Sequence, residues 1–394
     1  MTTPYYFTWS AQNSAVDFPV SHAAGDQFIL PDDRRVFDMI STSFQANFGH
    51  SHQTIRERIQ RQLEYLPITS PKSAFDLKAR VSRGLLDLIG LGDGKIFYTV
   101  SGAEAVENAL KIARQQTGRR IVMARQKSYH GASLGALSVT GDWRNDPHLT
   151  YDEGTLRIPE PGDDPECEQT RKLVIEAGPD NIAAVIVETI SGTNGMAIPP
   201  QSWFDAMFDL CREFGIYYIA DEVLVGFGRC QDHFAFQSFQ LKPDMITLSK
   251  GITGGYIPFG AVWTSAQIAS EYDDDVLACG LTNYGHPLGL AALEGVLDTM
   301  VDPGFMRHKA TLEKMFAERV WNLRNYDFVS EVRCRGLMAA VDFNGRDAVS
   351  WQHGFDAGMH LFGKGGMNIF APPLNSDESH LSEALDRYEN ILKG

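Results

Sequence analysis

The sequence predicts an α/β fold built on a largely parallel sheet. Short apolar and β-branched runs recur from about residue 95, and amphipathic helical stretches such as 103–116 and 201–215 separate several of them. Strands of a parallel sheet, buried on both faces, have this composition, and their alternation with helices is typical of α/β folds. The predicted strands are KIFYTV (95–100), RIVMAR (120–125), AAVIVET (183–189), IYYIADEV (216–223), DMITLSK (244–250) and FGAVWTS (259–265).

Two segments depart from this alternation of strands and helices. Residues 141–166 are rich in Pro, Gly and Asp and predict a long surface loop. Beyond residue 290 we expect a helix, a few strands and a closing helix. The prediction is therefore a large domain over 45–294 and a smaller α+β domain formed jointly by 1–44 and 295–394.

Composition and charge argue against several classes of protein. The formal net charge of −15 disfavours nucleic acid or an anionic membrane as a partner. No apolar run approaches the roughly 18 residues of a membrane span, and the amino terminus lacks the pattern of a secretion signal. The five cysteines are far apart and form no C-x-x-C pair, which disfavours a disulfide framework or a zinc site. We expect a cytoplasmic protein without a bound metal.

The residues of chemical interest lie at the carboxyl ends of the predicted strands, the edge where open α/β sheets bind ligands. Ser101-Gly102-Ala103-Glu104 follows the first strand and opens a helix. Ser101 and Glu104 match a capping box, but such a turn can also bind a phosphate through free N–H groups and the helix dipole. Neither a P-loop lysine nor G-x-G-x-x-G is present here, so a nucleotide site is poorly supported.

The residues at three further strand ends can each be interpreted either as structural or as part of a binding site. Tyr129 and His130 follow the second strand, either as a packed rim or as a stacking platform for an aromatic ligand. Asp221, at the end of the fourth, needs a cationic partner if it is buried, or else caps a turn. Glu188, which ends the third strand, poses this question with less force.

Lys250 ends the fifth strand and is followed by Gly251, Gly254 and Gly255, which leave room for a flat ligand. A surface lysine is the ordinary interpretation. A partly desolvated lysine, however, has a lowered pKa, and its neutral amine can attack a carbonyl. A phosphate-binding turn, a stacking ring, an acid and an amine together describe one ligand, pyridoxal phosphate, with which Lys250 would form an imine.

These residues belong to longer motifs, namely TVSGAEAVENALKIAR (99–114), SYHGAS (128–133), VETISGTNGMAIPP (187–200), DEVLVGFGR (221–229), SKGITGGYIPFGA (249–261) and GLTNYGHPLGLAALEG (280–295). The motifs resemble those of class III (ω-amino-acid type) aminotransferases, and their wording is closest to the branch that contains taurine aminotransferases. The resemblance implies a fold type I PLP-dependent transferase, with helices on both faces of a large, mostly parallel sheet.

The resemblance also implies roles for the matching residues. Lys250 would be the Schiff-base lysine, and Asp221 would keep the pyridine nitrogen protonated so that the ring accepts electrons when a Cα proton departs. Lys250, once displaced by substrate, would move that proton. Val223 and Tyr129 would cover the two ring faces. The further cofactor contacts implied are Ser101, Gly102 and Ala103 at the phosphate, His130, Glu188, and Thr282 from the neighbouring subunit of a homodimer or larger homo-oligomer.

The substrate end of the site departs from the branch. An arginine often precedes the APPL segment there, whereas here the nearest cation is Lys364, in LFGKGGMNIFAPPL. Glu188 begins E-T-I-S-G where many relatives carry E-P-x-x-G. We expect Lys364 either to meet the anionic end of a substrate or to be a solvated loop residue, with Phe7 and Trp9 lining the apolar side of the pocket.

The function expected from this resemblance is transfer of a primary, non-α amino group from an amine or ω-amino acid to a keto acid such as pyruvate or 2-oxoglutarate, through pyridoxamine phosphate. An aminomutase or amino-acid racemase of the same family is the nearest alternative. A cofactor-binding regulator is disfavoured by the intact Lys250 and Asp221, and a nicotinamide dehydrogenase by the missing glycine fingerprint.

Overall fold

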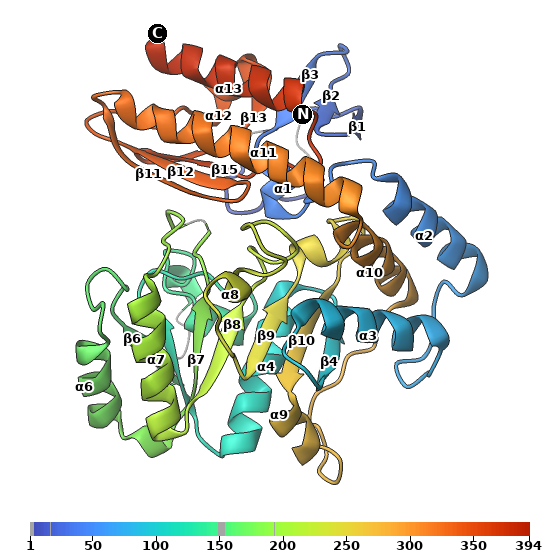
Figure 1. The fold of residues 1–394 in the computed structure, drawn as a ribbon, viewed down its shortest axis with the longest axis vertical. Helices are drawn as coiled ribbons and strands as arrows, with labels where there is room; N and C mark the ends of the chain where they lie inside the picture. Colours follow the sequence, from blue (N-terminus) through green and yellow to red (C-terminus); the bar gives the residue numbers. More distant parts are fainter. Residues whose placement is uncertain (1–3, 16, 149–153, 193) are drawn as a thin grey trace.

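The computed structural model describes residues 4–15, 17–148, 154–192 and 194–394. Its largest element is a seven-stranded sheet, here called the central sheet, in the lower half of Figure 1. The strand order is β4-β10-β9-β8-β7-β5-β6, and only β10 runs antiparallel to its neighbours. The strands are β4 (Gly94–Thr99), β5 (Ile121–Arg125), β6 (Thr155–Ile158), β7 (Ile182–Glu188), β8 (Tyr217–Asp221), β9 (Met245–Leu248) and β10 (Gly260–Ser265). The predicted α/β fold with a largely parallel sheet is confirmed.

One strand of the central sheet was not predicted. The segment 141–166, expected to be a surface loop, contains β6 and a short 3-10 helix (Asp146–His148) among its described residues. β6 is an edge strand that pairs only with β5. Its sequence, TLRI, has four residues and carries an arginine between two apolar side chains, so it lacks the apolar run by which buried strands are recognised.

Helices cover both faces of the central sheet. On one face, α4 (Gly102–Thr117) packs against β7, β9 and β10. The opposite face is covered by α3 (Asp76–Ile89), α7 (Gln201–Phe214) and α10 (Pro287–Met300), whose apolar side chains share one core. Within β8, Ile219 joins the core under α4, while Tyr218 and Ala220 join the other, as strand alternation requires. The helices near the edges of this region are α2 (Gln53–Tyr65), α5 (Leu134–Val139), α6 (Glu168–Ala177), α8 (Ala235–Ser238) and α9 (Ala266–Glu271).

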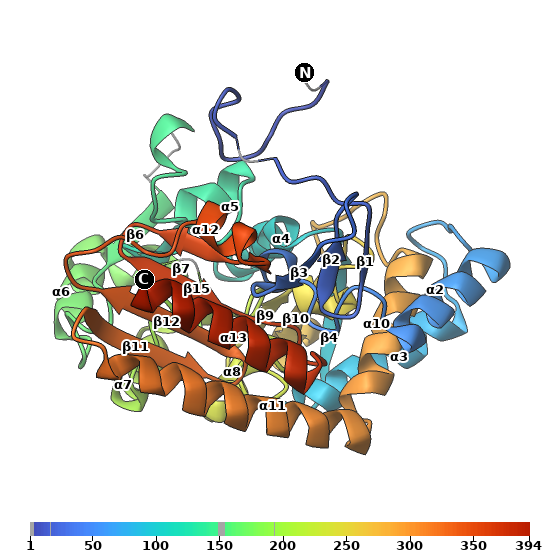
Figure 2. The same ribbon diagram turned by 90° about the horizontal axis from the view of Figure 1, so that it is seen from above.

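Two smaller sheets lie beyond the carboxyl edge of the central sheet (Figures 1 and 2). The amino-terminal sheet holds β1 (His22–Ala24), β2 (Gln27–Ile29), β3 (Arg35–Asp38) and β13 (Met359–His360). The carboxyl-terminal sheet holds β11 (Val329–Arg335), β12 (Met338–Phe343), β15 (Met367–Phe370) and β14 (Phe362–Lys364). They are accompanied by α11 (Pro303–Asn322), α12 (Trp351–Asp356) and α13 (Glu378–Lys393). Because β13 pairs with β3, the two ends of the chain share a sheet. None of the helices in the described residues is long and apolar enough to cross a membrane.

The turn after β3 has an unusual backbone. Ser41, Thr42, Ser43 and Phe44, assigned as α1, have φ angles of 45°, 48°, 63° and 69°. All four lie in the left-handed region, which costs an L-residue roughly 1–2 kcal/mol and is normally visited by single residues. Backbone bonds close the turn, from Phe44 N–H to the Ile40 carbonyl at 2.7 Å and from Gln45 N–H to the Ser41 carbonyl at 2.9 Å. Such a turn persists only where its surroundings hold it.

Arg229 joins this turn to both halves of the molecule. Its side chain is fully buried, and burial lowers its pKa to about 10. The guanidinium donates to the Pro372 carbonyl at 2.5 Å, the Leu337 carbonyl at 3.2 Å, the Ser41 hydroxyl at 2.9 Å and Asn47 Oδ1 at 2.8 Å. One side chain therefore satisfies four acceptors from three separate segments of the chain.

Replacing Arg229 should destabilise the fold. Arg229→Ala leaves several buried acceptors without a donor, so we expect a loss of about 3 kcal/mol and a clearly lower melting temperature. Arg324→Ala, which removes an exposed arginine, is the matched control and should change stability by no more than about 0.5 kcal/mol. Thermal unfolding of the two variants followed by fluorescence measures the difference. Equal melting temperatures would contradict this role for Arg229.

Candidate active site

A cavity of about 490 Å³ lies at the carboxyl edge of the central sheet, between the sheet and α1 and β14. It brings together residues from many parts of the chain. Nine of the predicted site residues line it: Trp9, Gly102, Ala103, Tyr129, His130, Glu188, Asp221, Val223 and Lys250. The cavity is therefore the candidate active site.

Asp221 lines the cavity and is only 4% exposed. In the sheet it is flanked by Glu188 of β7 and Thr247 of β9. His130 Nδ1 lies 2.6 Å from Asp221 Oδ2, while the Val223 N–H and the Thr247 hydroxyl donate to Oδ1 at 3.0 and 3.1 Å. These three contacts fix the orientation of the carboxylate.

His130 is itself held in place, since its backbone N–H donates to Thr140 Oγ1 at 3.0 Å. Its Nε2 is buried and has no hydrogen-bond partner among the described residues. A buried polar atom without a partner is costly, so a group completing this site would need to supply one.

Lys250 lies two residues after the last residue of β9, and its side chain is half-buried in the cavity wall. Burial lowers the pKa of its ammonium group, and the nearby charges of Asp221 and Glu188 oppose this shift. Its own φ of 47° is left-handed, an unusual conformation for a lysine. The amine is thus biased towards its neutral form, in which it can act as a nucleophile or a base.

The floor beside α4 suits an anion. The Ser101 hydroxyl accepts from the Glu104 N–H at 3.2 Å, and the Glu104 carboxylate accepts from the Val100 N–H at 2.9 Å, a variant of the predicted capping box. Ser101 caps the helix, whereas Gly102 and Ala103 line the cavity. A Cβ on Gly102 would lie 2.8 Å from Val223 Cγ1, so only glycine allows this approach. The N-terminus of a sixteen-residue helix here is a phosphate-binding feature.

Tyr129 and Val223 both line the cavity, as expected of residues that cover the two faces of a ring. Burial raises the pKa of the Tyr129 hydroxyl. With the helix N-terminus, the buried carboxylate and the lysine, these residues fit pyridoxal phosphate: an anchored acid for the ring nitrogen, an amine for the aldehyde and a helix end for the phosphate.

Glu188 is held mainly by the protein. Arg125, almost fully buried, donates to Glu188 Oε2 at 3.0 Å and to Glu160 at 2.8 Å. The Tyr129 N–H donates to the same oxygen of Glu188 at 3.4 Å. Burial raises the pKa of Glu188 and the charge of Arg125 opposes that shift. Glu188 therefore fixes the loop of Tyr129 as well as lining the cavity.

Four of the sequence-predicted residues do not line this cavity: Ser101, which caps α4, and Thr282, Phe7 and Lys364. Thr282 is exposed and is not part of the lining. Phe7 packs edge-on against Tyr5, with ring centroids 5.6 Å apart, within the amino-terminal segment. Lys364 is exposed near the tip of the β14–β15 hairpin, and it is Phe362 of the same strand that lines the cavity.

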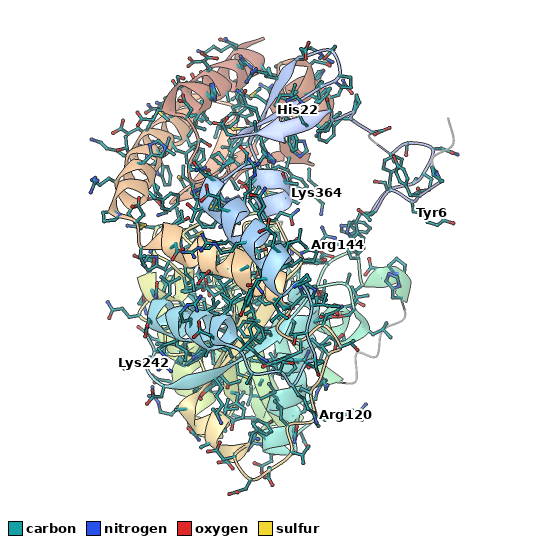
Figure 3. All side chains as sticks on the ribbon, turned by 90° about the vertical axis from the view of Figure 1, so that its right-hand side faces the viewer. Tyr6, His22, Arg120, Arg144, Lys242 and Lys364 are labelled. Atoms are coloured by element: carbon teal, nitrogen blue, oxygen red, sulfur yellow. The ribbon has the colours of Figure 1, made fainter. Side chains whose placement is uncertain are left out.

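Arg144, labelled in Figure 3, also lines the cavity, and the sequence analysis missed it. Its guanidinium is paired with Asp142 and lies 4.4 Å from the ring centroid of Tyr129, 5.3 Å from that of Trp9 and 5.5 Å from that of Trp143. Its side chain is 14% exposed. No local signal singled it out, because two of its aromatic neighbours come from distant segments. Also missed were Ile40, Ser43, Phe44, Leu224 and Phe362.

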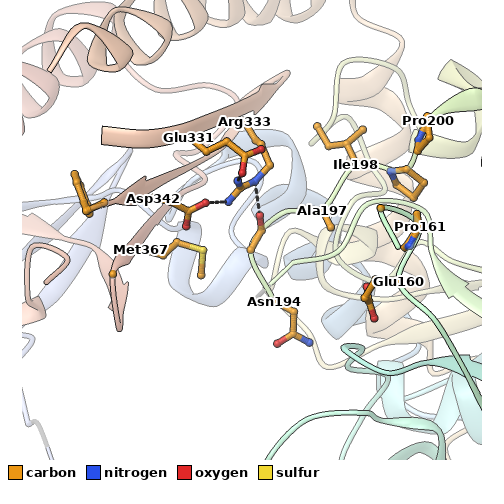
Figure 4. A pocket seen from close by; sticks show the side chains of 15 residues that line it. Glu160, Pro161, Asn194, Ala197, Ile198, Pro200, Glu331, Arg333, Asp342 and Met367 are labelled. Carbon is orange, nitrogen blue, oxygen red and sulfur yellow. Dashed lines mark hydrogen bonds and ion pairs between the residues drawn. The ribbon is translucent and has the colours of Figure 1, made fainter. Parts of the chain in front are cut away.

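A larger cavity, of about 690 Å³, lies between the loop after β7 and the carboxyl-terminal sheet (Figure 4). Arg333 crosses it, contacting Asp342 and Glu331 at 2.5 Å and the Gly195 carbonyl at 2.7 Å. Its described lining contains no lysine, histidine, serine or cysteine. It lacks the groups that a pyridoxal phosphate site needs, so the smaller cavity is the better candidate.

Comparison with known proteins gives a consistent picture. A family model described as aminotransferase class-III matches residues 9–392. An omega-aminotransferase of Caulobacter vibrioides is 29% identical over 95% of this chain and 93% of its own. A leucine/methionine racemase of Thermococcus litoralis is 27% identical over 92% and 87% of the two chains. The structure of a taurine:2-oxoglutarate aminotransferase of Bifidobacterium kashiwanohense, in complex with PLP and glutamate, matches with a TM-score of 0.92 at 30% identity, over 98% of this chain and 95% of that one.

The assignment of Lys250 is open to a direct chemical check. Borohydride treatment of the cofactor-loaded protein should attach pyridoxal phosphate irreversibly to Lys250, which peptide mass spectrometry would locate. Lys250→Ala should keep weak cofactor binding through the α4 N-terminus and the ring contacts but lose amino transfer. A reduced adduct on another lysine would overturn the assignment.

Asp221→Asn should preserve the fold, because the two side chains are nearly equal in size, yet remove the negative charge from the cavity floor. We expect the rate of amino transfer to fall by at least about 100-fold, as for other single charge-stabilising groups. Thr311→Val, an exposed site on α11, serves as control and should retain the parent rate. A near-normal rate for Asp221→Asn would mean that the carboxylate is structural.

Proposed function

Because the chain belongs to the class III aminotransferases, which depend on pyridoxal phosphate, we propose that it moves a primary, non-α amino group from an amine or ω-amino acid to a keto acid such as pyruvate or 2-oxoglutarate. The observation that carries this proposal is one cavity that holds an amine, Lys250, an anchored acid, Asp221, and a lining cation, Arg144. The first two serve the reaction and the third serves substrate recognition.

Each residue has a distinct task in the reaction. When bound, pyridoxal phosphate supplies the electron sink and carries the amino group between the two substrates. Asp221, held by His130 and the Val223 N–H, would present its carboxylate to the ring nitrogen. Lys250, with its pKa lowered by burial, can accept a proton at Nζ and return it to a different atom. Gly102 and Ala103, at the start of α4, would hold the phosphate.

The presence of Arg144 in the cavity lining favours a substrate with an anionic group. A guanidinium can grip a carboxylate or sulfonate through two parallel hydrogen bonds, and a partly buried anion without such a partner is strongly disfavoured. Arg144 is oriented by Asp142 and by the rings around it, so little freedom is lost on binding. The relative from Bifidobacterium kashiwanohense is named for taurine and 2-oxoglutarate, which carry an anionic sulfonate and two carboxylates respectively. We propose ω-amino carboxylates or ω-amino sulfonates as donors.

The assembly and location complete the proposal. Thr282 is exposed, so in this proposal it contacts the cofactor phosphate of a second copy, as expected from the sequence. The enzyme would then be a homodimer or larger homo-oligomer, acting in the cytoplasm. Residues 45–294 would form the cofactor-binding domain, and 1–44 with 295–394 the domain that covers it.

A panel of amines, tested with pyruvate and with 2-oxoglutarate, decides this function. Amino transfer requires both substrates, so a second amino compound should appear only when a keto acid is present. A racemase or aminomutase, the activity class of the relative from Thermococcus litoralis, would convert its substrate without any acceptor. Turnover that is independent of keto acid would favour that alternative.

Arg144 and Lys364 make a matched pair for testing the substrate class. Arg144→Gln should lower kcat/KM for an ω-amino carboxylate or sulfonate by roughly 10- to 100-fold, about 1.4–2.7 kcal/mol, because a charged hydrogen-bond donor is lost. It should change uncharged primary amines much less. Lys364→Ala, which removes an exposed cation outside the cavity, should leave both classes unchanged. If Lys364→Ala, and not Arg144→Gln, selectively impaired anionic donors, this would support the interpretation from sequence that Lys364 meets the anionic end of the substrate.

A further inference from the structure

Two side chains join β7 and β8 beyond the last paired residues of these strands. Glu188 of β7 lies opposite Asp221 of β8, and both acids line the cavity. The residues that follow them, Thr189 and Glu222, are fully buried and do not line it, as strand alternation requires. The Thr189 hydroxyl donates to Glu222 Oε1 at 2.6 Å. A side-chain hydrogen bond therefore continues the pairing of the two strands by one residue.

Glu222 has further partners on other elements. Its Oε1 also accepts from the Phe236 N–H at 2.8 Å, and its Oε2 accepts from the Ala235 N–H at 2.8 Å. Its backbone N–H donates to the carbonyl of Thr247 on β9 at 3.0 Å, and the hydroxyl of the same threonine donates to Asp221. Glu222 thus connects the ends of β7, β8 and β9 with the start of α8.

The charge of Glu222 depends on these hydrogen bonds. Burial raises the pKa of this carboxyl to about 7, and the charge of Asp221 adds to the rise. The bond from Thr189 and those from the two N–H groups of α8 oppose it. The Tyr218 hydroxyl and the Cys230 thiol are the other titratable groups that respond to its charge. Loss of the Thr189 bond would therefore favour a neutral Glu222 and reduce the negative charge beside Asp221 near neutral pH.

The hydroxyl at position 189 belongs to the E-T-I-S-G segment of this chain. The pattern E-P-x-x-G has proline at this position, and a proline side chain has no group that could donate to Glu222. The bond between Thr189 and Glu222 is therefore a consequence of the point at which this sequence departs from that pattern.

We propose that Thr189 is a positioning residue, which acts through Glu222 to hold the ends of β7 and β8 together at the cavity. The carboxylates fixed in this way are those of Glu188 and Asp221, and the charges of both act on Lys250. Thr189 itself lies outside the cavity lining. This inference deepens the proposed function and rests on it, because it names a residue that sets the electrostatics of the same site.

Three replacements of Thr189 separate its hydroxyl from its shape. Thr189→Val keeps the shape and removes the bond to Glu222, Thr189→Ala removes the bond with less bulk, and Thr189→Ser keeps the bond.

The matched control is Thr170→Val. The Thr170 hydroxyl donates to Asp164 Oδ2 at 2.7 Å, both residues are buried, and they lie at α6, outside the cavity lining. Thr189→Val and Thr170→Val should lower the melting temperature by comparable amounts, since each removes one donor from a buried carboxylate.

The first measurement needs neither cofactor nor substrate. Hydrogen exchange of peptides covering residues 220–237 reports the N–H groups that bond to Glu222 or from it, namely those of Glu222, Gly226, Ala235 and Phe236. Exchange should be at least about threefold faster in Thr189→Val and Thr189→Ala than in the parent, because the strand end opens more readily. It should be unchanged in Thr189→Ser and Thr170→Val.

The second measurement follows the absorption of bound pyridoxal phosphate as the pH is varied. The midpoint of the change reports the proton on the nitrogen that joins the cofactor to Lys250. In Thr189→Val and Thr189→Ala the midpoint should fall by at least about 0.5 pH unit, because the negative charges that favour the protonated form are weaker or less well placed. Thr189→Ser and Thr170→Val should keep the parent midpoint. The pH dependence of kcat for amino transfer should move in the same direction as the midpoint.

The outcomes are distinguishable. A parent-like midpoint in Thr189→Val and Thr189→Ala would overturn the proposal even if exchange were faster, and so would an equal shift in Thr170→Val or in Thr189→Ser. If the parent protein transferred no amino group from any donor, the proposed function would fail. The midpoint and the exchange data would still test whether Thr189 positions the two acids.

Discussion

The buried carboxylate of Asp221 is the constraint on which the site depends. A charge that is 4% exposed persists only with partners, and three donors from three different segments supply them: His130, the Val223 N–H and Thr247. Placing those donors requires that β5, β8 and β9 end at one edge in fixed register, with the loop of His130 folded over them. The same edge brings Lys250 into the cavity. The need to pair the buried Asp221 carboxylate and the geometry of the parallel sheet therefore together determine where the candidate site lies.

The cavity is closed by segments that lie far from the sheet in sequence. Arg229, on the loop after β8, donates to the Ser41 hydroxyl and to the Pro372 carbonyl. The charged side chain thereby connects the floor of the site to the turn that forms its wall. Four successive residues with left-handed φ angles are energetically unfavourable, and these buried hydrogen bonds stabilise them. The turn thereby keeps the Phe44 ring next to Lys250.

Sequence patterns predicted the parts of this protein that depend on local composition. All six expected strands of the central sheet are present, within one or two residues at most ends, and the helix opened by Ser101 begins at Gly102. β6 was missed because an edge strand of four residues, with Arg157 at its centre, has no apolar run. Arg144 was missed for a different reason: Trp9, Tyr129 and Arg144 are spread over 136 positions, and their stacking exists only in the folded chain.

The sequence by itself predicted the fold class, the cofactor and nine of the residues that line the candidate site. Apolar periodicity indicates the strands, and Lys250, Asp221 and Gly102 lie near the strand ends where side chains converge. Tertiary structure alone decided that Arg144 and not Lys364 lines the cavity, and which turn forms part of its wall. The sequence alone does not show whether Lys364 or Arg144 lies at the cavity. In the folded chain Lys364 is exposed on a hairpin, whereas Arg144 is paired with Asp142 and packs against three aromatic rings, including that of Tyr129. Long-range packing makes that distinction, since it sets burial and orientation, which a linear pattern does not encode.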